Sequence, residues 1–566
     1  MQAARRLYVY LLSGVSLGFV LVGLQALVRV LLETLGMRGD VLSGELDVSQ
    51  QLSGALALVG VGTPVWLLHW WFAERSSRPD RDHDNAERES AIRGLYFALV
   101  LAILLAFSAF ALTDLMFGLL ADLVAAEDAY FGAPPAPALA TAMVGGAAWA
   151  YHATLRRRDM SGGELHRAAV WLPRAYLYGA AFGGAAWVLG SLLPLIDAAV
   201  RAFVGDSVDP LVWVGAVGPA IVGAAVWFGH AWYASRLRAE PGWRGASERA
   251  ARLRLGYFVA LIVVGVAGTI GFASAAVEPI LEALFVGFDS RTVPAVATSA
   301  IAALPFAVGA WWYHARSLRR DATTDVDADR PLLAWRLEHV AVGLTGLAFA
   351  AAGSARLITI ILEAIFGSSP LIVSGSPRSE LELDLPLALI GAAVWTWAWV
   401  PLERRHQADP RAEATSTVRR AALLIVLAVA VIAGLSSLAL ILYRLFGFLL
   451  GAGLSGDAVS ELSTPAGILS VALAVGLYHG LALRRDLVLA PQAAQPEAEA
   501  APTPQPRPEA EAEPIPAEEA TWEDEGGPVL PPGLSLTLHG PDGADLEAAL
   551  KAARDALPEG YRLERD

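Results

Sequence analysis

Apolar segments of about 20 residues recur along most of this chain of 566 residues. The first runs from Leu7 to Leu32, and each is long enough to cross the hydrocarbon core of a bilayer as a helix. Hydrophobic residues make up 55% of the chain and charged residues only 17%. The sequence therefore predicts an all-α integral membrane protein surrounded by the lipid bilayer.

An aromatic residue, a histidine and an arginine cluster recur together about every 80 residues. The motif reads AAWAYHATLRRRD at 147–159, GAWWYHARSLRRD at 309–321 and VGLYHGLALRRDL at 475–487. The histidine column consists of His69, His152, His230, His314 and His479, with Ala398 in the fifth repeat. A second column consists of Glu33, Asp114, Asp197, Glu282, Glu363 and Arg444. Two columns with one period predict six tandem repeats, at about 1–80, 81–160, 161–240, 241–322, 323–406 and 407–486.

Each repeat holds two apolar segments, which predicts a two-helix unit and twelve transmembrane helices in total. The first helices are expected near 7–33, 94–120, 170–200, 255–286, 337–366 and 420–449. The second helices are expected near 52–73, 137–155, 211–234, 294–315, 384–402 and 465–483. Because each unit crosses the membrane twice, all six units share one orientation and are parallel repeats, unlike the inverted repeats of many transporters.

Arginines cluster in the loops that join one repeat to the next, whereas the loops inside the repeats hold only isolated ones, at Arg38, Arg291 and Arg378. Positively charged loops stay in the cytoplasm, so we expect both termini on the cytoplasmic side. Lys551 is the sole lysine. This arginine bias, with abundant alanine and glycine, is typical of a GC-rich bacterial genome and indicates the inner (cytoplasmic) membrane.

The composition changes sharply after the membrane domain, which we place at 1–486. Residues 487–526 are rich in Pro, Glu and Ala, which predicts a disordered acidic linker. Residues 527–566 alternate like a strand, then show helical spacing, then end in a second possible strand, so we expect a small β-α-β-like segment. Such a segment is too small to bury much core, and it is a candidate contact for a protein partner or for a second copy of the chain.

A tryptophan precedes the histidine by three residues in four repeats, in the pairs Trp66–His69, Trp149–His152, Trp227–His230 and Trp311–His314. The interpretation that we favour is an interfacial belt, in which these aromatic rings, the histidines including His479, and the arginines lie at the membrane surface. A second is a packing contact, in which the histidine bonds the polar, aromatic start of a neighbouring first helix, such as RGLYF at 93–97. A metal or haem site is not favoured, because each repeat offers one histidine, cysteine is absent, and no HxxxH or HExxH pair is present. We therefore expect no bound metal or cofactor.

Several charged residues lie inside the predicted helices, where an ionisable side chain suggests a functional site. These candidates are Arg29, Asp114, Glu278, Glu282, Arg356 and Glu363. Arg356 and Glu363 are two helical turns apart on one face, and Arg29 has Glu33 one turn further on. Such groups form either structural ion pairs between helices or a polar path through the membrane, and we favour structural pairs.

The repeating unit combines a first helix that opens in Arg-Leu-Tyr or Arg-x-x-Tyr with a second that closes in Trp-x-x-His and arginines. In this it resembles the prokaryotic membrane family catalogued as domain of unknown function 5671, over residues 1–486. The chain departs from the pattern at Ala398, at Gly476 in place of tryptophan, and at Arg444 in place of the acid. The resemblance implies no activity and no functional residues.

Two functions follow from these patterns. The first is a membrane scaffold or signalling-partner protein whose cytoplasmic tail recruits another protein. The alternative is a transporter or channel that moves a small solute or ion along intramembrane Arg, Asp and Glu side chains. An enzyme is not favoured, because no Walker motif, dinucleotide fingerprint, nucleophile elbow or metalloprotease motif is present. Nucleic acid is not an expected partner, because no basic, aromatic-interleaved soluble region is present.

Overall fold

The computed structural model describes residues 2–37, 48–78, 86–124, 135–160, 167–285, 293–323, 329–366, 377–450 and 458–493. Within these ranges every regular element is a helix, which agrees with the all-α prediction. The predicted linker and β-α-β-like segment at 487–566 fall almost wholly outside the described residues; only 487–493 are described, as the end of a helix.

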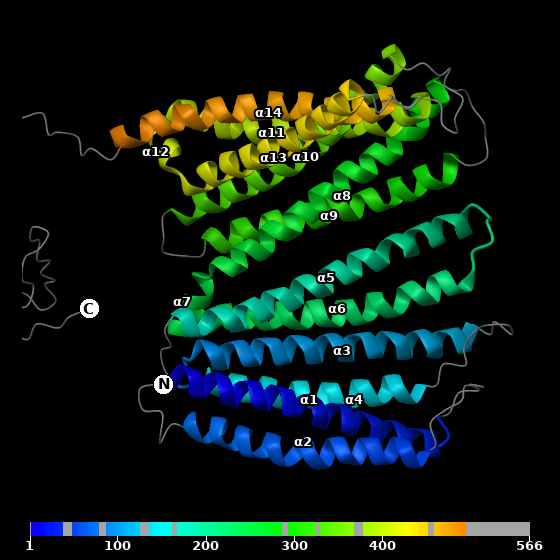
Figure 1. Ribbon diagram of the computed structural model, residues 1–566, viewed down its shortest axis with the longest axis vertical. Helices are drawn as coiled ribbons and strands as arrows, with labels where there is room; N and C mark the ends of the chain where they lie inside the picture. Colours follow the sequence, from blue (N-terminus) through cyan, green and yellow to red (C-terminus); the bar gives the residue numbers. More distant parts are fainter. Residues whose placement is uncertain are drawn as a thin grey trace, which may run out of the picture. The chain divides into compact units, whose positions relative to one another are not determined.

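Long helices come in pairs along the described chain (Figure 1). The pairs are α1 (Gln2–Thr34) with α2 (Val48–Ser76), α3 (Ala91–Val124) with α4 (Pro135–Asp159), α5 (Arg167–Phe203) with α6 (Pro210–Ala239), α8 (Arg252–Phe285) with α9 (Val293–Thr323), α10 (Arg330–Phe366) with α11 (Pro377–Ala408), and α13 (Thr417–Leu449) with α14 (Ala458–Ala493). Two short helices, α7 (Trp243–Arg249) and α12 (Pro410–Thr415), lie in the linkers before α8 and α13. Each pair packs as a hairpin, so the six predicted two-helix units correspond to six hairpins.

Each hairpin packs against the next one along the chain, from the first hairpin to the sixth. We call the end where one hairpin joins the next the linker end, and the end with the loops inside the hairpins the turn end. Figure 1 shows α7 and α12 at this same end, beside different hairpins. The arginine-rich segments that the structure describes between hairpins are therefore brought to one end of this bundle.

Glycines allow the two helices of a hairpin to approach closely. A Cβ atom built on Gly184 of α5 would lie 2.6 Å from the backbone nitrogen of Trp227 on α6. A Cβ on Gly391 of α11 would lie 2.5 Å from the backbone nitrogen of Ala350 on α10. These distances are too short for any side chain, so the small residues in the sequence mark real backbone contacts between helices.

Ten described helices are long and apolar enough to cross a membrane, which makes the protein membrane-embedded by length and composition. The predicted number of twelve spans is not reached, because α4 and α9 fail this criterion. In α4, alanine and proline stand where the other helices carry larger aliphatic residues, which lowers the hydropathy while the helix itself forms. For α9, the criterion covers only the part of the helix whose side chains the structure describes.

Candidate functional site

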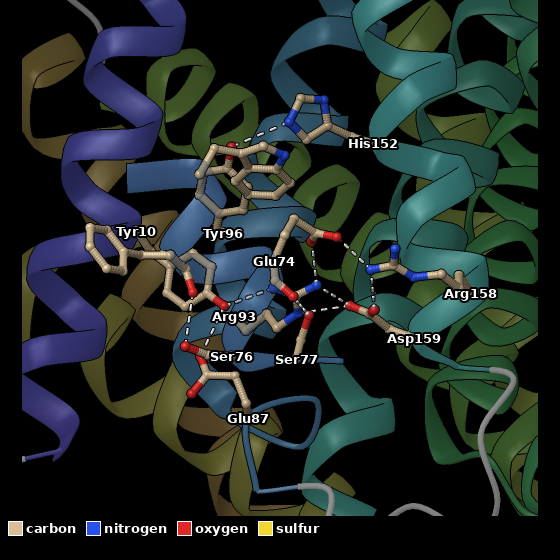
Figure 2. Close-up of polar contacts among 12 residues, drawn as sticks. Tyr10, Glu74, Ser76, Ser77, Glu87, Arg93, Tyr96, His152, Arg158 and Asp159 are labelled. Carbon is tan, nitrogen blue, oxygen red and sulfur yellow. Dashed lines mark hydrogen bonds and ion pairs between the residues drawn. The ribbon is translucent and has the colours of Figure 1, made fainter. Parts of the chain in front are cut away.

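A buried arginine at the start of α3 organises the linker end of the first two hairpins (Figure 2). The side chain of Arg93 is 0% exposed, and its Nε donates to Asp159 Oδ2 at the end of α4, at 2.7 Å. Its Nη1 donates to Tyr10 Oη on α1 and its Nη2 to Glu74 Oε1 on α2, both at 2.9 Å. One guanidinium therefore joins all four helices, using the fixed fork of donors that only arginine offers.

The segment just before α3 adds a third carboxylate to this cluster. Glu87 Oε1 accepts a hydrogen bond from Tyr10 Oη at 3.0 Å, and its Oε2 accepts from Arg6 Nε at 2.8 Å. Tyr10 thus accepts from Arg93 and donates to Glu87, so the hydroxyl uses both of its roles. On the α4 side of the cluster, Arg158 donates to Glu74 Oε2 at 2.5 Å.

The third and fourth hairpins repeat the arrangement. Arg254 Nε donates to Asp321 Oδ2 at 2.9 Å and its Nη1 to Tyr178 Oη at 3.3 Å. Tyr178 donates to Glu248, which also accepts from Arg174 Nε at 2.8 Å. The acid that Glu74 supplies in the first cluster is absent, and Arg238 on α6 contacts Asp321 Oδ1 instead, at 2.7 Å.

A third cluster joins the fifth and sixth hairpins. Arg419 Nε donates to Asp486 Oδ2 and its Nη2 to Glu403 Oε1, both at 2.8 Å. Glu413 Oε1 accepts from Arg336 Nη2 at 2.6 Å and from Arg405 Nε at 2.8 Å. Val340 stands where the first two clusters have tyrosine, so the hydroxyl bridge is missing here.

The spacing of these residues shows that the structural repeat is a pair of hairpins. The central arginine precedes its aspartate by 66, 67 and 67 residues in the three clusters. Glu87, Glu248 and Glu413 each precede the central arginine by six residues. Removing one member of such a buried pair costs about 3–5 kcal/mol, so each cluster locks two hairpins together.

The column histidines lie at the same end but belong to a separate set of contacts. His152 Nε2 lies 3.2 Å from Tyr96 Oη, and His230 Nε2 lies 3.0 Å from Tyr176 Oη. All five column histidines place Nδ1 against the carbonyl oxygen four residues earlier, as His152 does against Ala148 at 2.8 Å. A carbonyl only accepts, so Nδ1 carries the proton and Nε2 of these neutral rings accepts from the tyrosine.

Tryptophans of the repeat motif extend these contacts. Trp149 Nε1 donates to Tyr176 Oη at 2.7 Å and so connects α4 with α5. The other indole donors to tyrosine are Trp70, Trp227 and Trp399. His152, His314 and His479 are buried, whereas His69 is half-buried. This is the geometry of the packing interpretation, and within the described ranges no group of His, Asp and Glu side chains is placed to hold a metal ion.

Three of the six candidate intramembrane charges contact a neighbouring helix. Arg356 Nε on α10 lies 3.4 Å from Asp384 Oδ2 on α11, with the arginine side chain 46% exposed. Glu363 accepts a hydrogen bond from Ser463 Oγ on α14 at 2.6 Å. Arg29 Nη2 donates to Gln51 Oε1 at 2.5 Å, and its Nε lies 3.6 Å from Glu33 Oε1.

The other three candidates lie on α3 and α8. Asp114 is exposed on α3, Glu278 is half-buried on α8, and the side chain of Glu282 lies outside the described residues. The six candidates are spread over α1, α3, α8 and α10. They do not form one site.

Sequence reasoning missed the residues of the three clusters. The sequence interpretation expects the arginines at the end of the repeat motif at the membrane surface and assigns no role to the aspartate that follows them. A usable signal is present, because Asp159, Asp321 and Asp486 all end the motif and all follow a first-helix arginine by a nearly constant distance. Glu87, Glu248 and Glu413 carry a comparable signal, because each lies six residues before the central arginine, whereas Tyr10 and Glu74 carry none that extends to all three clusters.

One family model matches this chain three times, at residues 6–134, 94–218 and 336–475. Its description is Domain of unknown function (DUF5671). Together the matches cover more than half of the chain and include residues of all three clusters, from Arg6 to Arg419. No curated protein and no solved structure matches the chain.

Proposed function

This chain belongs to the DUF5671 family, whose description assigns no activity, and we propose from its own geometry that it is a membrane scaffold. The observation that carries this proposal is the set of three buried arginine clusters, which use charged side chains to fix helix against helix. A transporter must exchange helix contacts during its cycle, whereas breaking any one cluster leaves a buried charge without its partner. The scaffold is completed by residues 487–566, which recruit a cytoplasmic protein partner or a second copy of the chain.

The proposed scaffold crosses the inner membrane twelve times with both termini in the cytoplasm. Support for α4 and α9 as spans comes from their pairing, because each is the second helix of a hairpin whose first helix is itself a candidate span. The 25 residues of α4 are about 37 Å long as a helix, which exceeds the hydrocarbon thickness of a bilayer. The arginines gathered at the linker end support a cytoplasmic location for that end.

The scaffold proposal is tested by comparing the full chain with a chain that ends at residue 486. Both are expressed with the same N-terminal tag, cross-linked in intact cells and purified. We expect one cytoplasmic protein, or a second copy of the chain, to be recovered at a constant ratio with the full chain only. Equal recovery with both chains, or no recovered partner, contradicts the recruiting role of the tail.

Transport is the second candidate, and the pair of half-exposed Arg356 with the more buried Asp384 favours it. A charge pair on facing helices that remains partly open is a possible stopping point for an ion or polar solute. Purified protein in liposomes distinguishes the two functions. Transport predicts a solute or ion flux that Arg356→Leu abolishes while the protein still folds, and the scaffold predicts no flux above that of protein-free liposomes.

A further inference from the structure

A cavity of about 920 Å³ lies between the second hairpin and the third, lined by α3 to α7. Most of its length is apolar, with Leu101, Leu105 and Leu112 on α3 facing Ile221 and Val222 on α6. Its linker end is polar, so the cavity has one charged end and one apolar end. This volume is in the range of sites that hold a whole small molecule.

The charged end of the cavity is basic. Its lining contains four arginines and two glutamates, namely Arg156, Arg157, Arg174, Arg244, Glu240 and Glu248. Arg174 is bound to Glu248 at 2.8 Å, and Arg244 lies 3.8 Å from Glu240. The guanidinium of Arg156 lies over the ring of Phe97, and that of Arg157 over the ring of Tyr233. Four arginines against two glutamates give this end of the lining a net positive charge.

The internal repeat shows that Arg156 is specific to this place. The two equivalent positions, in the motifs ending at Asp321 and Asp486, are Leu318 and Leu483, and both leucines are buried. Arg156 is also buried, at 6% exposure, in a position that otherwise serves packing. Burying a guanidinium where leucine suffices is costly, which indicates a role for its charge.

The neighbouring arginine is neutralised in the equivalent interface between the fourth and fifth hairpins. There Arg319 takes the position of Arg157, and its Nε lies 3.1 Å from Glu338 Oε2. Tyr176 takes the position of Glu338 in the interface that holds the cavity, so this acid is replaced by a neutral side chain. Arg156 in place of leucine and Tyr176 in place of glutamate both make the cavity more favourable for an anion than the interface between the fourth and fifth hairpins.

In the interface between the fourth and fifth hairpins, a tryptophan also fills the space that corresponds to the cavity. Gly229 lines the cavity on α6, and the matching residue of α11 is Trp397. The ring of Trp397 lies 5.6 Å from the ring of Trp311 and 5.9 Å from that of His339. A Cβ atom added to Gly229 would meet no atom within 4 Å, so glycine leaves space here that tryptophan occupies in the other interface.

We propose that this cavity binds one anionic phospholipid from the membrane leaflet at the linker end. Its phosphate lies between Arg156 and Arg157, whose guanidinium groups match phosphate oxygens in geometry and charge. One acyl chain follows the apolar lining along α3 and α6. The inference is independent of the scaffold and transport proposals, because it rests on the cavity and its repeat-related counterpart.

The test uses the full chain, purified from its membrane in mild detergent and exchanged into fresh detergent before lipid analysis. We expect about one tightly held anionic phospholipid per chain, enriched over its share in the membrane. Arg156→Leu, which copies Leu318 and Leu483, lowers the retained anionic lipid about fivefold, as expected for one arginine facing an anionic headgroup. Gly229→Trp, which copies Trp397, lowers it at least as much by filling the cavity.

Two variants serve as matched controls. Arg316→Leu removes an exposed arginine at the same end of the bundle, and Gly183→Trp adds a tryptophan at an exposed glycine of α5 that does not line the cavity. Both retain the lipid, and the melting temperature of every variant checks that it folds. The proposal is overturned if wild-type protein retains no lipid, if the retained headgroups match the composition of the membrane, or if folded Gly229→Trp retains as much as wild type.

Discussion

At the scale of single residues, Arg93, Arg254 and Arg419 show how a charge is held at the edge of a membrane bundle. Each guanidinium lies beside an aspartate from the second helix of its own hairpin, at 2.7, 2.9 and 2.8 Å. In the first cluster, Arg93 has two further partners on the preceding hairpin, Tyr10 of α1 and Glu74 of α2. Charge and hydrogen bonds are satisfied together, so the buried ion stabilises one arrangement of the helices.

We expect Asp159→Asn to destabilise the protein by about 3–5 kcal/mol, because Arg93 then stays buried and charged without its nearest carboxylate. Thermal unfolding of the purified full chain measures the loss. Asp114→Asn, at an exposed carboxylate of α3, is the control and changes stability by less than about 0.5 kcal/mol. A similar, small change in both variants would show that the cluster does not lock the hairpins.

Replacing a column histidine separates packing from metal binding. His152→Leu removes the acceptor of the Tyr96 hydroxyl and leaves that buried group without its bond, at a cost of about 1–3 kcal/mol. His69→Leu is the control, because His69 is only half-buried and bonds the carbonyl of its own helix. Thermal unfolding and elemental analysis are measured together. A stoichiometric metal that is lost in either variant would contradict the packing role.

The sequence predicted where these residues lie but not what they contact. Arg93 and Asp159 stand at the start and the end of one predicted two-helix unit, so a hairpin alone brings them to the same end. Tyr10 and Glu74 belong to the preceding hairpin, and their contact with Arg93 depends on how two hairpins pack. No periodicity within one helix encodes that packing, and therefore the network could not be assembled from the sequence.

At the scale of the elements, hydropathy predicted the long helices well and the short ones not at all. The apolar run of each helix was located, yet α11 begins at Pro377, well before the predicted start near 384, because its first turns are polar. The linker helices α7 and α12 contain seven and six mostly polar residues, so neither hydropathy nor an apolar face marks them. Tertiary contacts hold both helices in place, because Glu248 of α7 and Glu413 of α12 each accept a hydrogen bond from an arginine of a cluster.

A reporter fusion at Gly205 tests whether α4 crosses the membrane. Gly205 follows α5, so it faces the periplasm if α1 to α5 all cross, starting from a cytoplasmic N-terminus. If α4 does not cross, every later element reverses and Gly205 lies in the cytoplasm. We expect an alkaline phosphatase fusion at Gly205 to be active and a fusion at Gly242, in the next linker, to be inactive. The reverse pattern would remove α4 from the spans.

At the scale of the whole membrane unit, residues 1–496, two kinds of boundary alternate between successive hairpins. Hairpins one and two, three and four, and five and six are joined by the arginine clusters. The boundary between hairpins two and three has no such cluster among the described residues and contains the cavity. The boundary between hairpins four and five has the Arg319–Glu338 pair and the packed rings of Trp311 and Trp397.

This alternation predicts where the chain tolerates a break. We consider three split versions, cut between α2 and α3, between α4 and α5, or between α9 and α10, each co-expressed as two fragments with a tag on the first. The first cut leaves Arg93 bound to Tyr10 and Glu74 across the break, so its fragments stay together in detergent. The second relies on Trp149 with Tyr176 and on contacts around the cavity, so its fragments separate first.

The third cut gives intermediate retention, because one ion pair and a packed aromatic contact span it. Co-purification of the untagged fragment, measured at rising detergent concentration, ranks the three boundaries. Arg93→Met in the first split version is the internal check, since it removes the cluster and brings retention down to the level of the second cut. If the second cut were the most resistant, the arginine clusters would not be what holds neighbouring hairpins together.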